Sequence, residues 1–69
     1  MDAEKLGLKK WYFTFMPSQE DKKNCYHVIE ADTMMAARAI MFIEYGDQWF
    51  TSYASAEEAG VDRFNLTEI

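Results

Sequence analysis

Apolar and polar positions alternate with a period of two in three segments, which is typical of half-buried strands. The segments are KKWYFTFM (9–16), CYHVIEA (25–31) and QWFTSYA (48–54). The first ends at Pro17, whose nitrogen cannot donate a hydrogen bond to a neighbouring strand. The polar segment 17–24 then predicts a hairpin loop between the first two strands.

Apolar positions in DTMMAARAIMFIEYG (32–46) follow a helical period. Asp32 or Thr33 is the expected N-cap, and the helix is expected to run to about Tyr45 and to stop at Gly46. Further along, Ser55 and Glu58 form a capping-box pattern that predicts a short helical turn ending at Gly60. The segment RFNLTEI (63–69) alternates apolar and polar residues and predicts a short edge strand.

The order of these elements predicts one α+β domain spanning residues 1–69. It has a small antiparallel or mixed sheet (β-β-α-β, a short helical turn and a C-terminal edge strand) with one main helix on one face. A right-handed crossover places the third strand parallel to the second, with the first between them in one arrangement. Residues 1–8 form a polar lead with a weak helical pattern, disordered in one interpretation.

The main helix is apolar almost all the way around. The face expected against the sheet comprises Ala36, Ala39, Ile40 and Ile43, with Met35 and Phe42 at one flank of it. The opposite, outward face comprises Met34, Arg38, Met41 and Tyr45. One interpretation is ordinary scattered apolar exposure. The other, which we adopt as the hypothesis, is that the outward face contacts a second protein chain, because Met suits adaptable interfaces and Tyr and Arg are enriched at binding hot spots.

A single helix covers only one face of the sheet. If the odd-numbered residues of the first strand face the helix, Tyr12 and Tyr26 point away from it, and the third strand adds either Trp49 and Tyr53 or Phe50 to that side. This second face is therefore expected to be aromatic and half-polar. Such a surface suits a protein partner or a flat ligand.

The chain is short and has little to reinforce its core. With 69 residues, it buries only about 60% of the surface of the unfolded chain, and such a core supplies about 3–5 kcal/mol. One cysteine and one histidine allow neither an internal disulfide nor a usual zinc site. We therefore expect no metal and no cofactor, and we expect a homo-oligomer.

The net charge of −5 disfavours nucleic acid as a partner. Lysines at 9, 10, 22 and 23 bracket the first hairpin, but they form no basic stripe, and an acidic domain could instead imitate DNA. No signal peptide and no membrane span are expected, because no apolar stretch approaches about 18 residues. These features predict a cytoplasmic location without membrane contact.

Candidate chemistry is limited to Cys25 and His27, which lie two apart on one strand and so share a face. A thiol near an imidazole can form a nucleophile pair, but a buried thiol and a packed histidine are far more common. The three glycines stand apart, and no phosphate-binding loop, HExxH or CxxC pattern is present. The sequence predicts that the protein is not an enzyme.

Four segments, WYFTF, YHVIEAD, AARAIMF and YGDQWFTSYASAEEAGVDRFNLTEI, resemble a group of short proteins from phages and prophages. That group has a Y-F-T-F strand, an I-E-A-D helix entry, an A-R-x-x-M-F helix core, a G-x-x-W strand and an A-G-V ending. The resemblance spans most of the chain from Trp11 to Ile69 and rests on packing motifs. It departs at Met16 and Pro17, where the group has a glycine, so any function of that loop does not carry over.

The resemblance implies an accessory protein of a mobile element, acting in a bacterial host cell. Such proteins often block or sequester a host component. The leading hypothesis is therefore a non-enzymatic protein that binds a host or bacterial-defence protein, as an anti-defence or anti-CRISPR inhibitor does. One alternative is an oligomeric sponge for a nucleotide-like small molecule. Another is a structural or interaction domain of a phage assembly.

Overall fold

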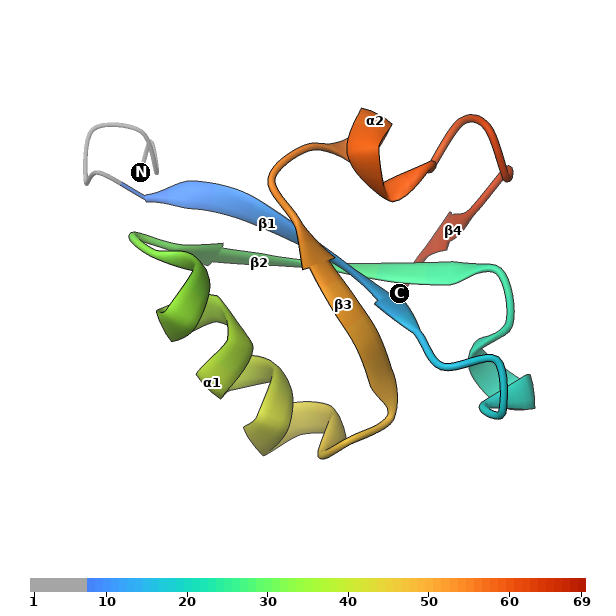
Figure 1. The fold of residues 1–69 in the computed structure, drawn as a ribbon, viewed down its shortest axis with the longest axis horizontal. Helices are drawn as coiled ribbons and strands as arrows, with labels where there is room; N and C mark the ends of the chain where they lie inside the picture. The colour runs from blue at the N-terminus through green and yellow to red at the C-terminus, as the bar shows by residue number, and fades with distance from the viewer. Residues whose placement is uncertain (1–7) are drawn as a thin grey trace.

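Two seven-residue strands form the hairpin around which the rest of the protein is built (Figure 1). The computed structural model describes residues 8–69, so the predicted lead of residues 1–8 lies, apart from Leu8, outside the described residues. Strands β1 (Lys9–Phe15) and β2 (Cys25–Ala31) pair antiparallel, with Trp11 opposite Ile29 and Phe13 opposite His27. The loop between them contains the short 3₁₀ helix η2 (Glu20–Lys22).

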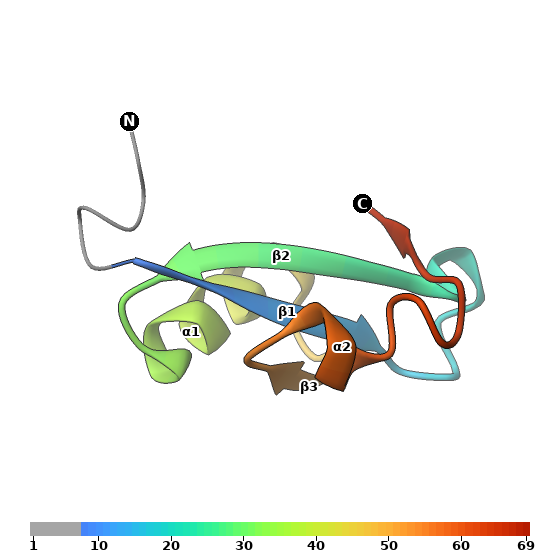
Figure 2. The same cartoon turned by 90° about the horizontal axis from the view of Figure 1, so that it is seen from above.

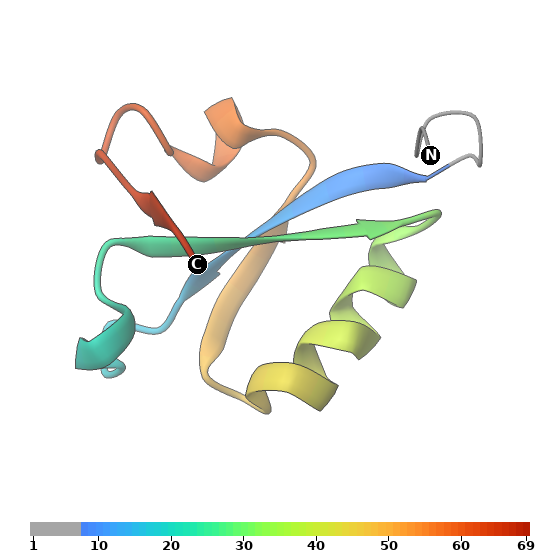
Figure 3. The same cartoon turned by 180° about the vertical axis from the view of Figure 1, so that it is seen from behind.

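The four strands are arranged in the order β3-β1-β2-β4. Strand β3 (Trp49–Tyr53) is antiparallel to β1 and therefore parallel to β2, as the predicted crossover requires. Strand β4 (Thr67–Glu68) pairs parallel with the start of β2 and forms the predicted C-terminal edge strand. The opposite views in Figures 1 and 3 bring first β3 and then β4 to the front. The predicted small α+β fold with a mixed sheet is confirmed.

A β-bulge between β1 and β3 changes the face to which β3 contributes. Tyr12 pairs with Tyr53, whereas Phe15 pairs with Trp49, and the register shifts between these pairs. Trp49 therefore lies on the face of Phe15, and Tyr53 on the face of Tyr12. Strict alternation along β3 had predicted that Trp49 and Tyr53 share one face. An extra bulged residue breaks that alternation.

Helix α1 (Met34–Tyr45) covers the face that holds Trp11, Phe13 and Phe15. Thr33, one of the two expected N-caps, begins the helix: its hydroxyl oxygen accepts a hydrogen bond from the Ala36 amide at 3.1 Å. At the other end Gly46 has a φ of 63°, a conformation that glycine adopts without steric cost. The predicted bounds of the helix are confirmed.

The orientation of α1 about its own axis differs from the prediction. The helix buries Ala37 and Met41 against the sheet, both with 0% exposed surface. Ile43, expected in the core, is 84% exposed, and Ala39 is also exposed. The core cluster comprises Phe13, Ile29, Ala31, Ala37, Met41 and Trp49. Ala36 and Ile40, the other two residues of the expected face, are partly buried against this cluster. The bulky rings of the sheet leave room for a small alanine and a flexible methionine at the centre of the contact.

The second face of the sheet is covered by the C-terminal part of the chain (Figure 2). Helix α2 (Ala56–Ala59) packs against β1 and β3 and buries Ala59. The Ser55 hydroxyl caps it by accepting from the Glu58 amide at 3.1 Å. Gly60 ends it in the left-handed conformation, and the Val61 amide donates to the Ala56 carbonyl at 3.1 Å. The predicted capping residue and helix stop are thus confirmed.

Candidate functional site: the outer face of α1

The side of α1 that faces away from the sheet carries a continuous apolar stripe. Its members are spaced at i, i+4, i+7 and i+8, so they lie on one face of the helix. Met35 is 73% exposed, Phe42 is 58% exposed and Ile43 is 84% exposed, and Ala39 completes the stripe. We call these four residues the α1 stripe. Exposed apolar residues grouped in this way mark interaction sites more often than singly scattered ones do.

The α1 stripe is anchored to the core through one aromatic contact. The ring of Phe42 packs edge-on against Trp49, with centroids 5.2 Å apart. Trp49 in turn packs edge-on against Phe13 at 5.3 Å, and the Arg38 guanidinium carbon lies 5.4 Å from the Trp49 ring centroid. Phe42 is therefore held in place although more than half of its surface is exposed. A rigid aromatic side chain loses little entropy when a partner binds.

An exposed aspartate flanks helix α1 at each end. Asp32 directly precedes the cap residue Thr33, and Asp47 directly follows Gly46. The other charged groups of the helix are already engaged. Arg38 lies over the Trp49 ring, and the Glu44 carboxylate lies 3.3 Å from the His27 imidazole. The surface therefore has an apolar centre and acidic ends.

The four helix residues predicted to face outward do not form an exposed surface. Met41 is fully buried, while Met34, Arg38 and Tyr45 are half-buried. The Tyr45 ring packs edge-on against Phe15, with centroids 5.0 Å apart. The predicted outward face was wrong because the helix is rotated. Polar-tipped side chains such as tyrosine and arginine bury their apolar or planar parts against aromatic residues.

The two sheet residues predicted to point away from α1 do so. The rings of Tyr12 and Tyr26 lie 6.2 Å apart on the face opposite Phe13. Both are half-buried, because α2 packs on this face and the Tyr26 hydroxyl donates to Glu68 at 3.5 Å. Desolvation and the Glu68 carboxylate raise the pKa of the Tyr26 phenol above 10.0. This face is therefore less open than the sequence predicted.

Met35, Phe42 and Ile43 were not predicted to be surface residues. The helical pattern predicted Met35 and Phe42 at the flanks of the core and Ile43 within it. The spacing of the α1 stripe is as regular as that of the core face, so periodicity alone cannot distinguish them. Side-chain volume was the signal that could have identified the buried face of the helix. A sheet face made of large rings leaves room at position 37 for a small alanine rather than for isoleucine; these rings belong to Trp11, Phe13, Phe15 and Trp49.

The polar contacts of Cys25 and His27 go to other groups. The Cys25 thiol donates to the Lys23 carbonyl at 3.5 Å. One His27 ring nitrogen donates to the main-chain oxygen of Ile69, and the other faces Glu44. His27 thereby links β2 to both α1 and the C-terminal segment. These contacts give the His27 imidazole a structural role, because they connect three segments of the chain.

Comparison with protein-family models, curated proteins and solved structures finds no match for this chain. Within residues 8–69, no group of three or more His, Cys, Asp and Glu side chains lies close enough to hold a metal ion. No helix in the same part of the chain has the length and apolar character needed to cross a membrane.

Proposed function

We propose that the protein is a non-enzymatic accessory protein of a phage or prophage, and that it acts by binding a host or bacterial-defence protein through the α1 stripe. The single observation that carries this proposal is the exposure of Met35, Phe42 and Ile43 on one face of a helix whose other face already fills the core. Most of the surface of these three side chains lies outside the core, although Phe42 also packs against Trp49. Their burial by a partner would contribute about 25 cal/mol per Å² of apolar surface.

The partner that fits this surface is a protein with an apolar groove and basic residues at the ends of the groove. The α1 stripe lies between Asp32 and Asp47, which would pair with those basic residues. A second copy of the chain fits less well. In an antiparallel pairing of two α1 helices, Asp32 of each copy would meet Asp47 of the other. In a parallel pairing each aspartate would meet itself. Like charges that face each other across an interface disfavour association.

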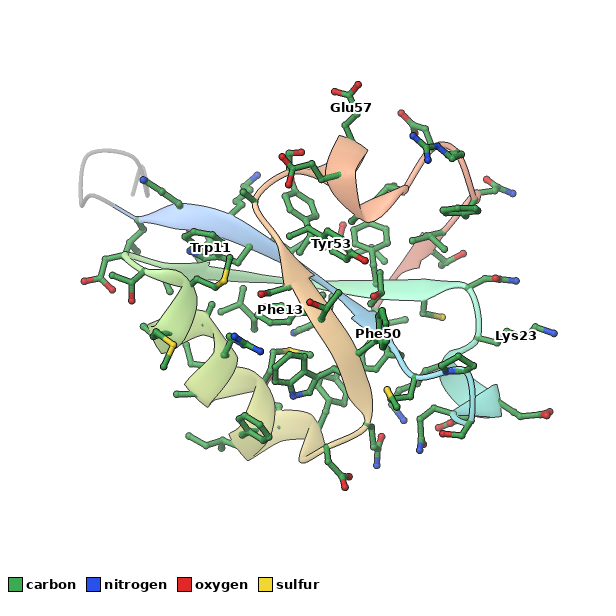
Figure 4. All side chains as sticks on the ribbon, viewed as in Figure 1. Trp11, Phe13, Lys23, Phe50, Tyr53 and Glu57 are labelled. Atoms are coloured by element: carbon green, nitrogen blue, oxygen red, sulfur yellow. The ribbon has the colours of Figure 1, made fainter. Side chains whose placement is uncertain are left out.

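A charge-neutral double variant tests the proposal. Met35→Glu with Ile43→Lys leaves the net charge unchanged and touches no core residue. We expect it to fold as the wild type does and to lose partner binding by more than tenfold, as truncation at a hot spot does. The matched control is Phe50→Ser, which removes an exposed apolar residue of β3 that points away from α1 (Figure 4). Circular dichroism monitors folding in both variants.

Binding is measured in two steps. The wild-type protein and both variants are used as bait in bacterial lysate, and a protein that the wild type and Phe50→Ser retain is purified and titrated by calorimetry. The proposal is supported if the α1 variant fails to bind the purified partner and if wild-type binding weakens with added salt. If light scattering instead shows a wild-type dimer that the α1 variant dissociates, the occupant is a second copy. If the α1 variant binds and assembles as the wild type does, the proposal is wrong.

A further inference from the structure

A separate pocket lies at the hairpin end of the sheet, away from the α1 stripe. It has a volume of about 320 Å³, at the lower end of the range of small-molecule sites. Phe15, Met16 and Pro17 form one wall where β1 ends, and Phe64 and Leu66 form the other. The two walls come from opposite ends of the described chain. A ligand between them would therefore contact the hairpin and the C-terminal segment together.

The charged residues that line this pocket are basic, whereas the net charge of the protein is −5. The described residues that line it include Lys22 and Lys23 and no acidic side chain, although the chain carries twelve acids. The Lys22 ammonium is already paired with Asp21 at 2.9 Å, and their hydrogen bond lowers the pKa of the Asp21 carboxyl below 3.8. Lys23 has no ionic partner among residues 8–69, and its side chain extends from the hairpin loop into solvent (Figure 4). The pocket thus has one uncompensated cation at its rim.

One wall of the pocket is an aromatic ring whose position is constrained. Phe64 is 61% exposed, yet its ring packs directly on the backbone of Gly60. A methyl group at Gly60 would come within 2.5 Å of Phe64 Cδ2. The Phe64 amide also donates to the Gly60 carbonyl at 2.9 Å. An exposed ring that is fixed in this way offers a flat surface on which another ring can stack.

We propose that this pocket binds a small anion that carries a flat aromatic ring. The ring stacks on Phe64 between the two apolar walls, and the exposed Lys23 side chain turns from solvent toward the pocket to pair with the anionic group. The apolar walls and the cation are both needed. A neutral ring lacks the ionic contact, and a bare anion gains nothing from the walls. This proposal concerns a different surface from the α1 stripe and is independent of the proposed function.

The test is an amide chemical-shift titration of the protein with 1-naphthyl phosphate. We expect saturable shifts at Lys23, Asn24, Cys25 and Leu66, with at least tenfold weaker binding of 1-naphthol and of inorganic phosphate. Bound probe should also slow alkylation of the Cys25 thiol, which lies in the pocket wall. A parallel titration with adenosine 5′-monophosphate identifies the source. Equal or tighter binding assigns the ligand to nucleotides, and weaker binding assigns it to other aromatic anions.

Two charge reversals provide a matched comparison. Lys23→Glu should weaken binding of 1-naphthyl phosphate by at least tenfold. Lys10→Glu makes the same change in net charge near the opposite end of β1, away from the pocket, and should change affinity by less than about twofold, because charges beyond a Debye length of about 8–10 Å are screened. The proposal is overturned if no saturable shifts occur, if 1-naphthol binds as tightly as its phosphate, or if both charge reversals weaken binding equally.

Discussion

At the scale of single residues, Trp49 organises the contact between α1 and the sheet. Phe13 lies against one part of its indole, and Phe42 and the Arg38 guanidinium lie against others. The indole nitrogen is buried without a hydrogen-bond partner among residues 8–69. Met41 fills the remaining space beside this cluster.

Truncation of Met41 tests the rotation of the helix directly. Met41→Ala should lower the free energy of unfolding by about 2–5 kcal/mol, because it leaves a cavity in the core. Ile43→Ala, two positions further along the same helix, should change it by no more than about 0.5 kcal/mol, as is typical of surface sites. Chemical denaturation followed by circular dichroism measures both values. A larger loss for Ile43→Ala than for Met41→Ala would contradict the observed orientation of α1.

At the scale of elements, the end of α2 connects the coverage of the second sheet face to the pocket. Gly60 has a φ of 79° and ends the helix, and the next residues place Phe64 back on the Gly60 backbone. The chain then continues into β4, where the Thr67 amide donates to the Asn24 carbonyl at 2.8 Å. Gly60 therefore sets the position of the aromatic pocket wall, and a second left-handed residue, Asn65 with a φ of 53°, turns the chain toward β4.

Gly60→Ala should destabilise the protein through two separate effects. The left-handed backbone costs about 1–2 kcal/mol for a residue with a side chain, and the new methyl group collides with Phe64. In the Phe64→Ala background only the backbone cost should remain, so the loss caused by Gly60→Ala should be smaller there. A double-mutant cycle with chemical denaturation separates the two terms. Additive losses would show that the Phe64 ring does not pack on Gly60.

The positions of the helices and strands along the chain were predictable from the sequence. The rotation of α1 about its axis and the face occupied by each residue of β3 were not. The strand pattern, the Thr33 and Ser55 caps and the stops at Gly46 and Gly60 depend on local chemistry, so the bounds of the first three strands and of both helices agree with the structure to within one residue. The strand predicted over 63–69 is limited to Thr67–Glu68. The rotation of α1 depends on which residues fit a sheet face made of large rings. The bulge in β3 depends on pairing with β1. Both are tertiary effects. Because of the rotation of α1, Met41, predicted on the outward face, is buried, and Ile43, predicted in the core, is exposed.

At the scale of the whole molecule, the core is small, and Phe13 and Met41 are its largest fully buried side chains. Only seven apolar residues of the described chain are buried, so the free energy of unfolding should be near the 3–5 kcal/mol expected for a domain of this size. Of the seven large apolar residues that the described chain leaves exposed, three lie together on α1. A partner that binds the folded protein at this surface would therefore also raise its free energy of unfolding.

Urea unfolding of the isolated protein should show one transition with a free energy of about 3–5 kcal/mol. The midpoint should not depend on protein concentration, because the acidic ends of the α1 stripe disfavour self-association. Circular dichroism at several protein concentrations measures this. A midpoint that rises with concentration would show that the folded state is a dimer, and it would support the homo-oligomer expected from chain length over the monomer favoured by charge.

Because of the β-bulge, the number of residues in β3 determines which face of the sheet each of its side chains occupies. Every residue after the shift faces the side opposite to the one that strict alternation would give it, so Tyr53 lies beside Tyr12 rather than under α1. Removal of a single residue at the bulge would reverse the facing of the strand beyond it without changing any other side chain. Related chains that keep this fold should therefore vary freely in the identity of the bulged residues and resist insertion or deletion there. An alignment gap between Phe50 and Ser52 would indicate a different packing of the sheet, however similar the remaining residues.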